Sequence, residues 1–129
     1  MRTLSIAGIL FSFVLPSTAL AGPEGTFHVK GANPDDGGDY SGTVKIVRKG
    51  EVYSVVWKLD GNETVGIGVG LRLVDGQLVA GPADEGDTGI SISYAADDTP
   101  GTATYIEQSD GTWHGVWAYQ GAEKLSTEE

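Results

Sequence analysis

Cysteine is absent from all 129 residues of the chain. Disulfide bonds, thiolate metal sites and a cysteine nucleophile are therefore excluded. So is a lipid anchor of the bacterial lipoprotein kind, which requires a cysteine. Small secreted domains often depend on disulfides because their cores are thin. A small domain without them must be held by strand pairing and apolar packing, and a closed sheet provides both while leaving no exposed edges.

Basic residues are scarce as well. Lys and Arg together number 8 against 18 Asp and Glu, which gives a formal net charge of −10. Nucleic acids and anionic lipid surfaces repel such a chain, so we expect neither a nucleic-acid partner nor a membrane partner. A modest basic group in the first half is typical of a solvated strand face; it consists of Lys45, Arg48, Lys49, Lys58 and Arg72.

Residues that could carry catalysis or bind metal are few. The two histidines, His28 and His114, are far apart in sequence, and two ligands without a third make a poor zinc site. The acidic segment 33–39 offers oxygens for calcium, but a calcium loop starting at Asn33 needs Glu in its twelfth position, where Val44 stands. No nucleophile elbow is present. We therefore expect no metal, no cofactor and no catalytic residues.

Only one long apolar run occurs, at residues 4–15, directly after a start that contains Arg2. It is shorter than the roughly 20 residues that a bilayer crossing takes. Small residues follow at Ala19 and Ala21, as in the cleavage site of an export signal. We predict a signal peptide at residues 1–21 and a single domain at residues 22–129. The mature protein is then expected in the periplasm or outside the cell.

Helical periodicity is also missing, and apolar residues alternate with polar ones instead. Asp-Gly pairs at 60–61, 75–76 and 110–111 suit two-residue hairpin turns. The alternation predicts eight strands, followed by a short closing piece at 123–125 and a frayed tail at 126–129. The strands are residues 26–31, 42–48, 52–59, 63–73, 77–80, 89–95, 102–108 and 112–119.

Eight strands joined in sequence by short turns form a meander, in which neighbours along the chain are neighbours in the sheet. Such a meander closes into an all-β, antiparallel, up-and-down barrel whose interior is filled or holds one small ligand. An immunoglobulin-like sandwich is the main competitor. It requires longer crossing connections, against which the tight Asp-Gly turns argue.

Glycines at positions 66, 68 and 70 alternate with apolar residues. A phosphate-binding glycine loop needs a helix N-terminus after it, so this alternation favours a structural role. Missing side chains on one face of a strand let the strand coil, or let aromatic rings or a ligand approach the backbone. We expect the apolar side of the sheet to look inward. On this strand the apolar residues facing one way are Val65, Ile67, Val69, Leu71 and Leu73.

Six aromatic residues fall on the apolar side of the predicted strands. They are Tyr53, Trp57, Tyr94, Trp113, Trp117 and Tyr119. Inside a barrel with an open mouth, these rings would line a pocket suited to a ring-bearing ligand. The alternative is that they fill the core of a small domain that needs their bulk.

A recurrent pattern of aromatic and glycine residues covers about residues 26–125. It reads Tyr40-x-Gly42-x-Val44-x-Ile46, Tyr53-x-Val55-x-Trp57, Gly66-x-Gly68, Thr104-Tyr105, Asp110-Gly111, Gly115-x-Trp117 and Gly121-x-Glu123-x-Leu125. With this pattern the chain resembles short exported bacterial β proteins of undetermined role, some of them labelled fibronectin-binding, which implies extracellular protein binding. In strand number and in tryptophans near strand ends it is more loosely similar to avidin-like and lipocalin-like barrels. That likeness is one of fold, and fold does not fix function.

Three functions follow from these observations. The leading hypothesis is an exported, non-enzymatic barrel that holds a small apolar or ring-bearing ligand, which requires an interior cavity of roughly 300–1,000 Å³. The alternative is a protein-interaction module, an adhesin or an inhibitor, which requires an exposed apolar patch. The third is a hydrolytic enzyme, which requires a histidine beside a carboxylate in a cleft.

Overall fold

The computed structural model describes residues 22–33 and 38–129, in which nine β-strands and no helix are found. The predicted signal peptide at 1–21 lies outside these described residues. In the described part, no helix has the length and apolar character needed to cross a membrane. The strands are β1 (Gly25–Ala32), β2 (Asp39–Lys49), β3 (Val52–Leu59), β4 (Asn62–Val74), β5 (Gln77–Gly81), β6 (Gly89–Ala96), β7 (Thr99–Glu107), β8 (Trp113–Tyr119) and β9 (Ser126–Glu128).

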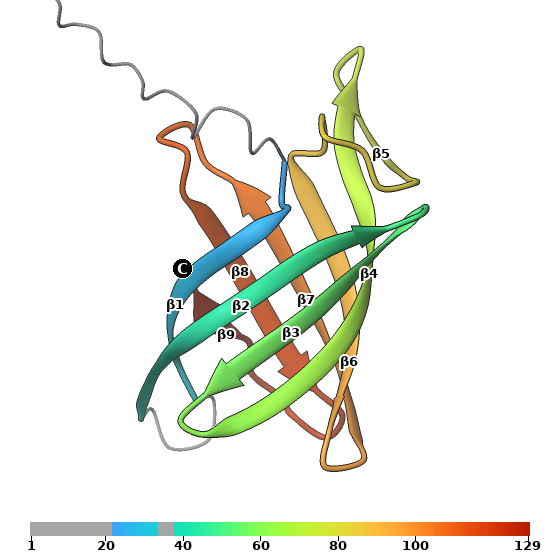
Figure 1. The fold of residues 1–129 in the computed structure, drawn as a ribbon. Coiled ribbons are helices and arrows are strands. Elements are labelled where there is room, and N and C mark those ends of the chain that lie inside the picture. Colours follow the sequence, from blue (N-terminus) through green and yellow to red (C-terminus); the bar gives the residue numbers. More distant parts are fainter. Residues whose placement is uncertain (1–21, 34–37) are drawn as a thin grey trace, which may run out of the picture.

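Eight of these strands close into an antiparallel barrel (Figure 1). The order around the wall is β1-β2-β3-β4-β6-β7-β8-β9, and β9 pairs back onto β1. The predicted all-β, eight-stranded, up-and-down barrel is therefore confirmed. The set of strands that form the wall differs from the prediction in two respects. The strand β5 lies outside the wall, and β9 belongs to it.

The strand β5 continues a hairpin beyond the end of the barrel. Residues 62–68 of β4 pair with β3, while residues 70–74 pair with β5. The long strand β4 thus leaves the wall at its far end and folds back on itself. We call residues 72–80, which include the hairpin turn, the β4–β5 arm; it projects from the upper end of the barrel in Figure 1.

The strand β9 closes the gap between β8 and β1, so the predicted fraying of residues 126–129 is wrong, and so is the predicted closing piece at 123–125. Glu128 is the register partner of both Gly115 on β8 and Gly31 on β1. Lys30 and Glu129 exchange two backbone hydrogen bonds of 2.8 and 2.9 Å. The segment shows no apolar alternation because the side chains that it turns inward are polar.

Two-residue turns join four pairs of successive strands, namely β2–β3, β3–β4, β4–β5 and β6–β7. Asp60-Gly61 and Asp75-Gly76 both have positive φ at each residue, as the predicted Asp-Gly hairpin turns require. Between β6 and β7 the turn residues are Asp97 and Asp98, with φ of 49° and 67°. Aspartate tolerates this left-handed conformation better than most residues. The short turns enforce the meander order.

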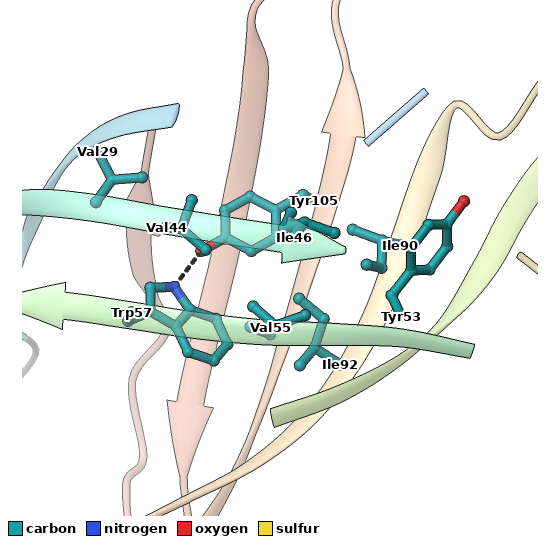
Figure 2. Packing of buried hydrophobic residues seen from close by; sticks show 10 residues of the cluster. Val29, Val44, Ile46, Tyr53, Val55, Trp57, Ile90, Ile92 and Tyr105 are labelled. Atoms are coloured by element: carbon teal, nitrogen blue, oxygen red, sulfur yellow. Dashed lines mark hydrogen bonds between the residues drawn. The ribbon is translucent and has the colours of Figure 1, made fainter. Parts of the chain in front are cut away.

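The barrel interior is packed with aliphatic side chains and the rings of Tyr53, Trp57 and Tyr105 (Figure 2). Tyr53 and Trp57 lie at opposite ends of this cluster, and the Trp57 indole points toward the Tyr105 hydroxyl. The cluster of buried residues comprises Val29, Val44, Ile46, Tyr53, Val55, Trp57, Ile90, Ile92, Ala103 and Tyr105.

The orientation of β4 corrects the expectation that the apolar side of every strand looks inward. Val65, Ile67 and Val69 are 58%, 56% and 43% exposed on the outer wall. The interleaved glycines face the interior instead. A Cβ atom on Gly66 would lie 2.8 Å from the Ser93 carbonyl oxygen and 3.2 Å from the Trp57 ring. Side chains and backbone of the neighbouring strands leave no room for side chains at these glycines, with Ile90 and Ile92 beside Gly68 and Asp87 beside Gly70, which confirms the predicted structural role of the glycines.

This crowding predicts that Gly66→Ala destabilises the barrel. The added methyl group must displace a backbone carbonyl, and overpacking of this kind costs about 1–3 kcal/mol of unfolding free energy. Ile67→Thr, on the exposed neighbouring position, is the matched control and should change stability by no more than about 0.5 kcal/mol. Urea unfolding followed by tryptophan fluorescence measures both. Equal stabilities of the two variants would contradict the inward placement of Gly66.

Candidate functional site

An aromatic cavity opens at the end of the barrel that carries the β3–β4 and β6–β7 turns. Its volume is about 720 Å³. Six aromatic side chains from five strands line this cavity. A sheet has to close on itself to bring side chains from these five strands around one hollow. They are Tyr40, Trp57, Tyr94, Tyr105, Trp117 and Tyr119. We refer to this hollow as the aromatic cavity.

Four of the six aromatic residues predicted to bind a ligand meet in this cavity, namely Trp57, Tyr94, Trp117 and Tyr119. The alternation of each strand turned them inward as expected. Trp57 and Tyr94 approach edge to face, with ring centroids 5.5 Å apart, and the rings of Trp117 and Tyr119 are 6.2 Å apart. Pairs at such distances hold one another in place.

The other two predicted residues do not reach the aromatic cavity. Tyr53 lies at the opposite end of the barrel, where its hydroxyl donates a 2.6 Å hydrogen bond to Asp87. Trp113 lines a separate hollow of about 310 Å³ together with Phe27 and Val29. Both rings point inward, but the barrel is long enough that inward side chains at its two ends form different sites.

The residues at the centre of the cavity's hydrogen-bond network were not among the predicted site residues; they are Tyr40, Tyr105 and Glu128. Tyr40 precedes the predicted start of its strand, although the alternation Tyr40, Gly42, Val44 already places it on the inward face. Glu128 is a carboxylate on the inward face of its strand, where it is 4% exposed. No sequence signal marks it, because it stands in a polar segment.

A hydrogen-bond network ties the carboxylate of Glu128 to the aromatic walls. Tyr40 donates to Oε2 at 2.5 Å, and Tyr105 donates to Oε1. Each tyrosine hydroxyl also accepts a hydrogen bond from a tryptophan indole. Trp117 Nε1 donates to the Tyr40 hydroxyl at 2.8 Å. Trp57 Nε1 donates to the Tyr105 hydroxyl at 2.9 Å. Every polar atom of the rings in this network is thereby paired, as buried polar groups require.

The network also fixes the protonation of its tyrosines. Burial raises the pKa of Tyr105 far above its ordinary value, and the neighbouring Glu128 carboxylate raises it further. Burial and the hydrogen bond to Glu128 raise the pKa of Tyr40 in the same direction. Both hydroxyls therefore stay protonated at neutral pH and keep donating to the carboxylate.

Charged side chains in the lining of the aromatic cavity are all acidic. Among the described residues they are Asp60, Glu63, Asp97 and Glu128, with no lysine, arginine or histidine. Glu63 forms an exposed pair with Lys58 at 4.0 Å outside the lining. The cavity therefore has aromatic walls and a negative potential.

The opposite end of the barrel contains a second polar cluster. Asp87 is buried there and accepts hydrogen bonds from the Tyr53 hydroxyl at 2.6 Å and the Asp84 backbone N–H at 2.9 Å. Its carboxylate occupies the space that a side chain on Gly70 would take. Burial and this carboxylate raise the pKa of Tyr53. This cluster occupies part of the interior at its end of the barrel, where Asp87 and Trp113 also line a hollow of about 380 Å³.

The two histidines lie on the outer wall. His28 and His114 are both exposed, and His114 Nε2 is 3.3 Å from a carboxylate oxygen of Glu129 in a solvent-exposed pair. Across residues 22–33 and 38–129 no group of three His, Asp or Glu side chains is arranged to hold a metal ion. Most of the acidic segment 33–39 lies outside the described residues.

Comparison with known proteins adds nothing to this geometry, since no family model, no curated protein and no solved structure matches the chain. Function must be argued from the cavity itself.

The raised pKa values predict alkaline unfolding. Burial raises the pKa of Tyr40, Tyr53, Tyr94 and Tyr105, so folding favours their neutral forms. The resulting stability is fully present below the unfolded-state pKa of about 10 and is lost as the pH rises above it. Tyrosinate absorbance should appear together with loss of the far-ultraviolet circular dichroism signal. Ionisation of these tyrosines near pH 10 in a protein that stays folded would contradict their burial.

Proposed function

We propose that this protein is a non-enzymatic binding protein that holds a small, ring-bearing ligand in the aromatic cavity. One observation carries the proposal: an open hollow of about 720 Å³ is lined by six aromatic side chains in a domain small enough to need them for its core. The volume falls within the range of small-molecule sites, roughly 300–1,000 Å³. Following the predicted signal at 1–21, we place this binding outside the cytoplasm.

The contrast between the two ends of the barrel supports binding. At one end the Tyr53 hydroxyl and the buried Asp87 carboxylate occupy interior space and are joined to each other by a hydrogen bond. At the other end the rings stand around a hollow and are fixed by hydrogen bonds and by one another. Walls that are ordered before a ligand arrives reduce the entropy lost on binding.

The lining supports binding over catalysis. It contains no histidine or lysine among the described residues that could serve as a base. Its one buried carboxylate, Glu128, is engaged by two tyrosine hydroxyls on opposite sides. The other carboxylates of the lining, Asp60, Glu63 and Asp97, are exposed, whereas a general base has to lie within hydrogen-bond reach of the proton that it removes from the bound ligand.

Binding can be tested with the neutral fluorescent probe N-phenyl-1-naphthylamine and two tryptophan variants. Trp113→Phe keeps only Trp57 and Trp117, both in the lining of the cavity, so the probe should quench most of the remaining tryptophan emission. The double variant Trp57→Phe/Trp117→Phe keeps only Trp113 at the other end, and its emission should barely change. The measurement is a fluorescence titration of each variant.

Ala103 provides the matched control for this titration. It is buried and lines the cavity, so Ala103→Leu fills part of the hollow without touching a ring hydrogen bond. Probe affinity should fall by roughly tenfold or more. Quenching of Trp113 rather than of the cavity tryptophans, or no probe binding at all, would refute the proposed function.

A second candidate function, contact with another copy of this chain, is favoured by the β4–β5 arm. Leu73 and Leu78 are cross-strand partners on the arm and are 66% and 60% exposed. In the described part of the chain β5 pairs with β4 alone, so its other edge offers unpaired backbone groups. Two such edges can pair antiparallel about a two-fold axis, which buries the leucines of both arms.

Self-association through the arm predicts a concentration-dependent dimer, because the net charge of −10 opposes a tight one. Light scattering coupled to size exclusion should show the mass rising with concentration and with added salt. The variant Leu73→Thr/Leu78→Thr should stay monomeric under the same conditions, and Val65→Thr, on the barrel wall, should behave as wild type. A wild-type protein that is monomeric throughout argues against this second function.

A further inference from the structure

We propose that the ligand of the aromatic cavity carries a positive charge, as a substituted ammonium group attached to an apolar or aromatic body, and that Glu128 selects this charge. The inference rests on the proposed function and specifies its ligand class. Three features of the cavity lead to it: the buried carboxylate, the aromatic lining and the acidic rim.

The buried carboxylate has no cationic partner. Glu128 is 4% exposed, and no lysine, arginine or histidine of the described residues lies within 4.0 Å of its oxygens. Its partners are the hydroxyls of Tyr40 and Tyr105, one on each oxygen. A carboxylate has about four acceptor sites, so these two hydroxyls leave acceptor capacity free. Burial of an uncompensated charge is costly, and a bound cation removes that cost.

The aromatic lining suits the same ligand. Rings of tyrosine and tryptophan attract cations through their negative faces, more strongly where water is excluded, and cages of such rings recognise quaternary ammonium groups. All six rings belong to Tyr or Trp and none to Phe. The hydrogen bonds that Trp57 and Trp117 donate to the tyrosines keep these rings in place around Glu128.

The acidic rim extends this preference to the mouth of the cavity. Asp60 and Asp97 come from the β3–β4 and β6–β7 turns and Glu63 from the start of β4, and no basic side chain of the described chain lines the cavity. A cleft with charges of one sign focuses its field and raises the local concentration of the opposite ion. An anionic ligand would meet four carboxylates and no basic side chain in the same lining.

A pair of ligands of equal shape tests the charge directly. Phenyltrimethylammonium and tert-butylbenzene differ only in a charged nitrogen replacing a carbon atom, and both compete with N-phenyl-1-naphthylamine for the cavity. Wild-type protein should bind the ammonium compound roughly tenfold more tightly or better. Added salt should weaken this preference, because part of it comes from the exposed rim.

Two variants assign the preference to Glu128. Glu128→Gln removes the charge but keeps the shape, and the preference for the ammonium compound should drop to near unity. Glu107→Gln removes one charge from an exposed position that does not line the cavity, and should leave the preference intact. Circular dichroism and thermal unfolding report whether each variant is folded. If Glu128→Gln does not fold, Asp97→Asn on the rim replaces it, with a smaller decrease in the preference expected.

The outcomes separate the two proposals. Equal binding of both compounds to wild-type protein overturns the charge inference while the proposed binding function stands. Failure of both compounds and of the naphthylamine probe to bind overturns the binding function itself. A preference that survives Glu128→Gln in folded protein overturns the assignment to Glu128.

Discussion

Closure of the barrel depends on the carboxylate of Glu128. The strand that carries it, β9, is three residues long and contributes few backbone hydrogen bonds. The side chain compensates by reaching beyond its immediate neighbours, to Tyr40 on β2 and Tyr105 on β7. Each of these strands lies one strand further out than β1 and β8, so a single side chain links five consecutive strands of the wall. The seam of the barrel is thus held by a polar interaction inside it.

The same network shapes the interior around it. Tyrosines that must reach Glu128 and tryptophans that must reach the tyrosines bring large rings to one end of the barrel. The neighbouring strand β4 has glycine on its inner face, where a Cβ atom on Gly66 would lie 2.8 Å from the Ser93 carbonyl oxygen and 3.2 Å from the Trp57 ring. The apolar residues of β4 are then left on the outside, where Val65 and Ile67 are more than half exposed. The crowded barrel interior and the exposed apolar side chains of β4 therefore have the same cause, which is that this strand turns its glycines inward.

Much of this architecture could be predicted from the sequence because strand periodicity and turn chemistry are local. Seven of the wall strands follow from alternation. Of the three predicted Asp-Gly hairpin turns, Asp60-Gly61 joins two wall strands and Asp75-Gly76 joins β4 to β5, whereas Asp110-Gly111 lies in a five-residue connection and Asp110 lacks positive φ. Alternation cannot tell which face of a strand is inside when one face is glycine and the other is aliphatic, as on β4. It also cannot distinguish a strand in the wall from one in a hairpin beyond it, as for β5. Pairing over long sequence distances decides both.

The candidate site was predictable to the extent that its residues follow alternation. Trp57, Tyr94, Trp117 and Tyr119 could be grouped from the inward faces of their strands, whereas the separation of Tyr53 and Trp113 depends on position along the barrel axis. Glu128 carries no local signal at all, because a carboxylate on the inward face of a strand is stabilised only by partners such as Tyr40, which is 88 residues away in sequence.

That sequence separation bears on how the domain reaches its native state. Contacts between residues that are distant in sequence form slowly. The chain loses conformational entropy when the long loop closes, before the contact has lowered the free energy of the folded state. The hairpins from β2 to β8 can form early from local contacts. The seam between β9 and β1 unites distant parts of the chain, so it is the natural last step of folding. Until it forms, the edges of β1 and β8 are open to strands of other molecules.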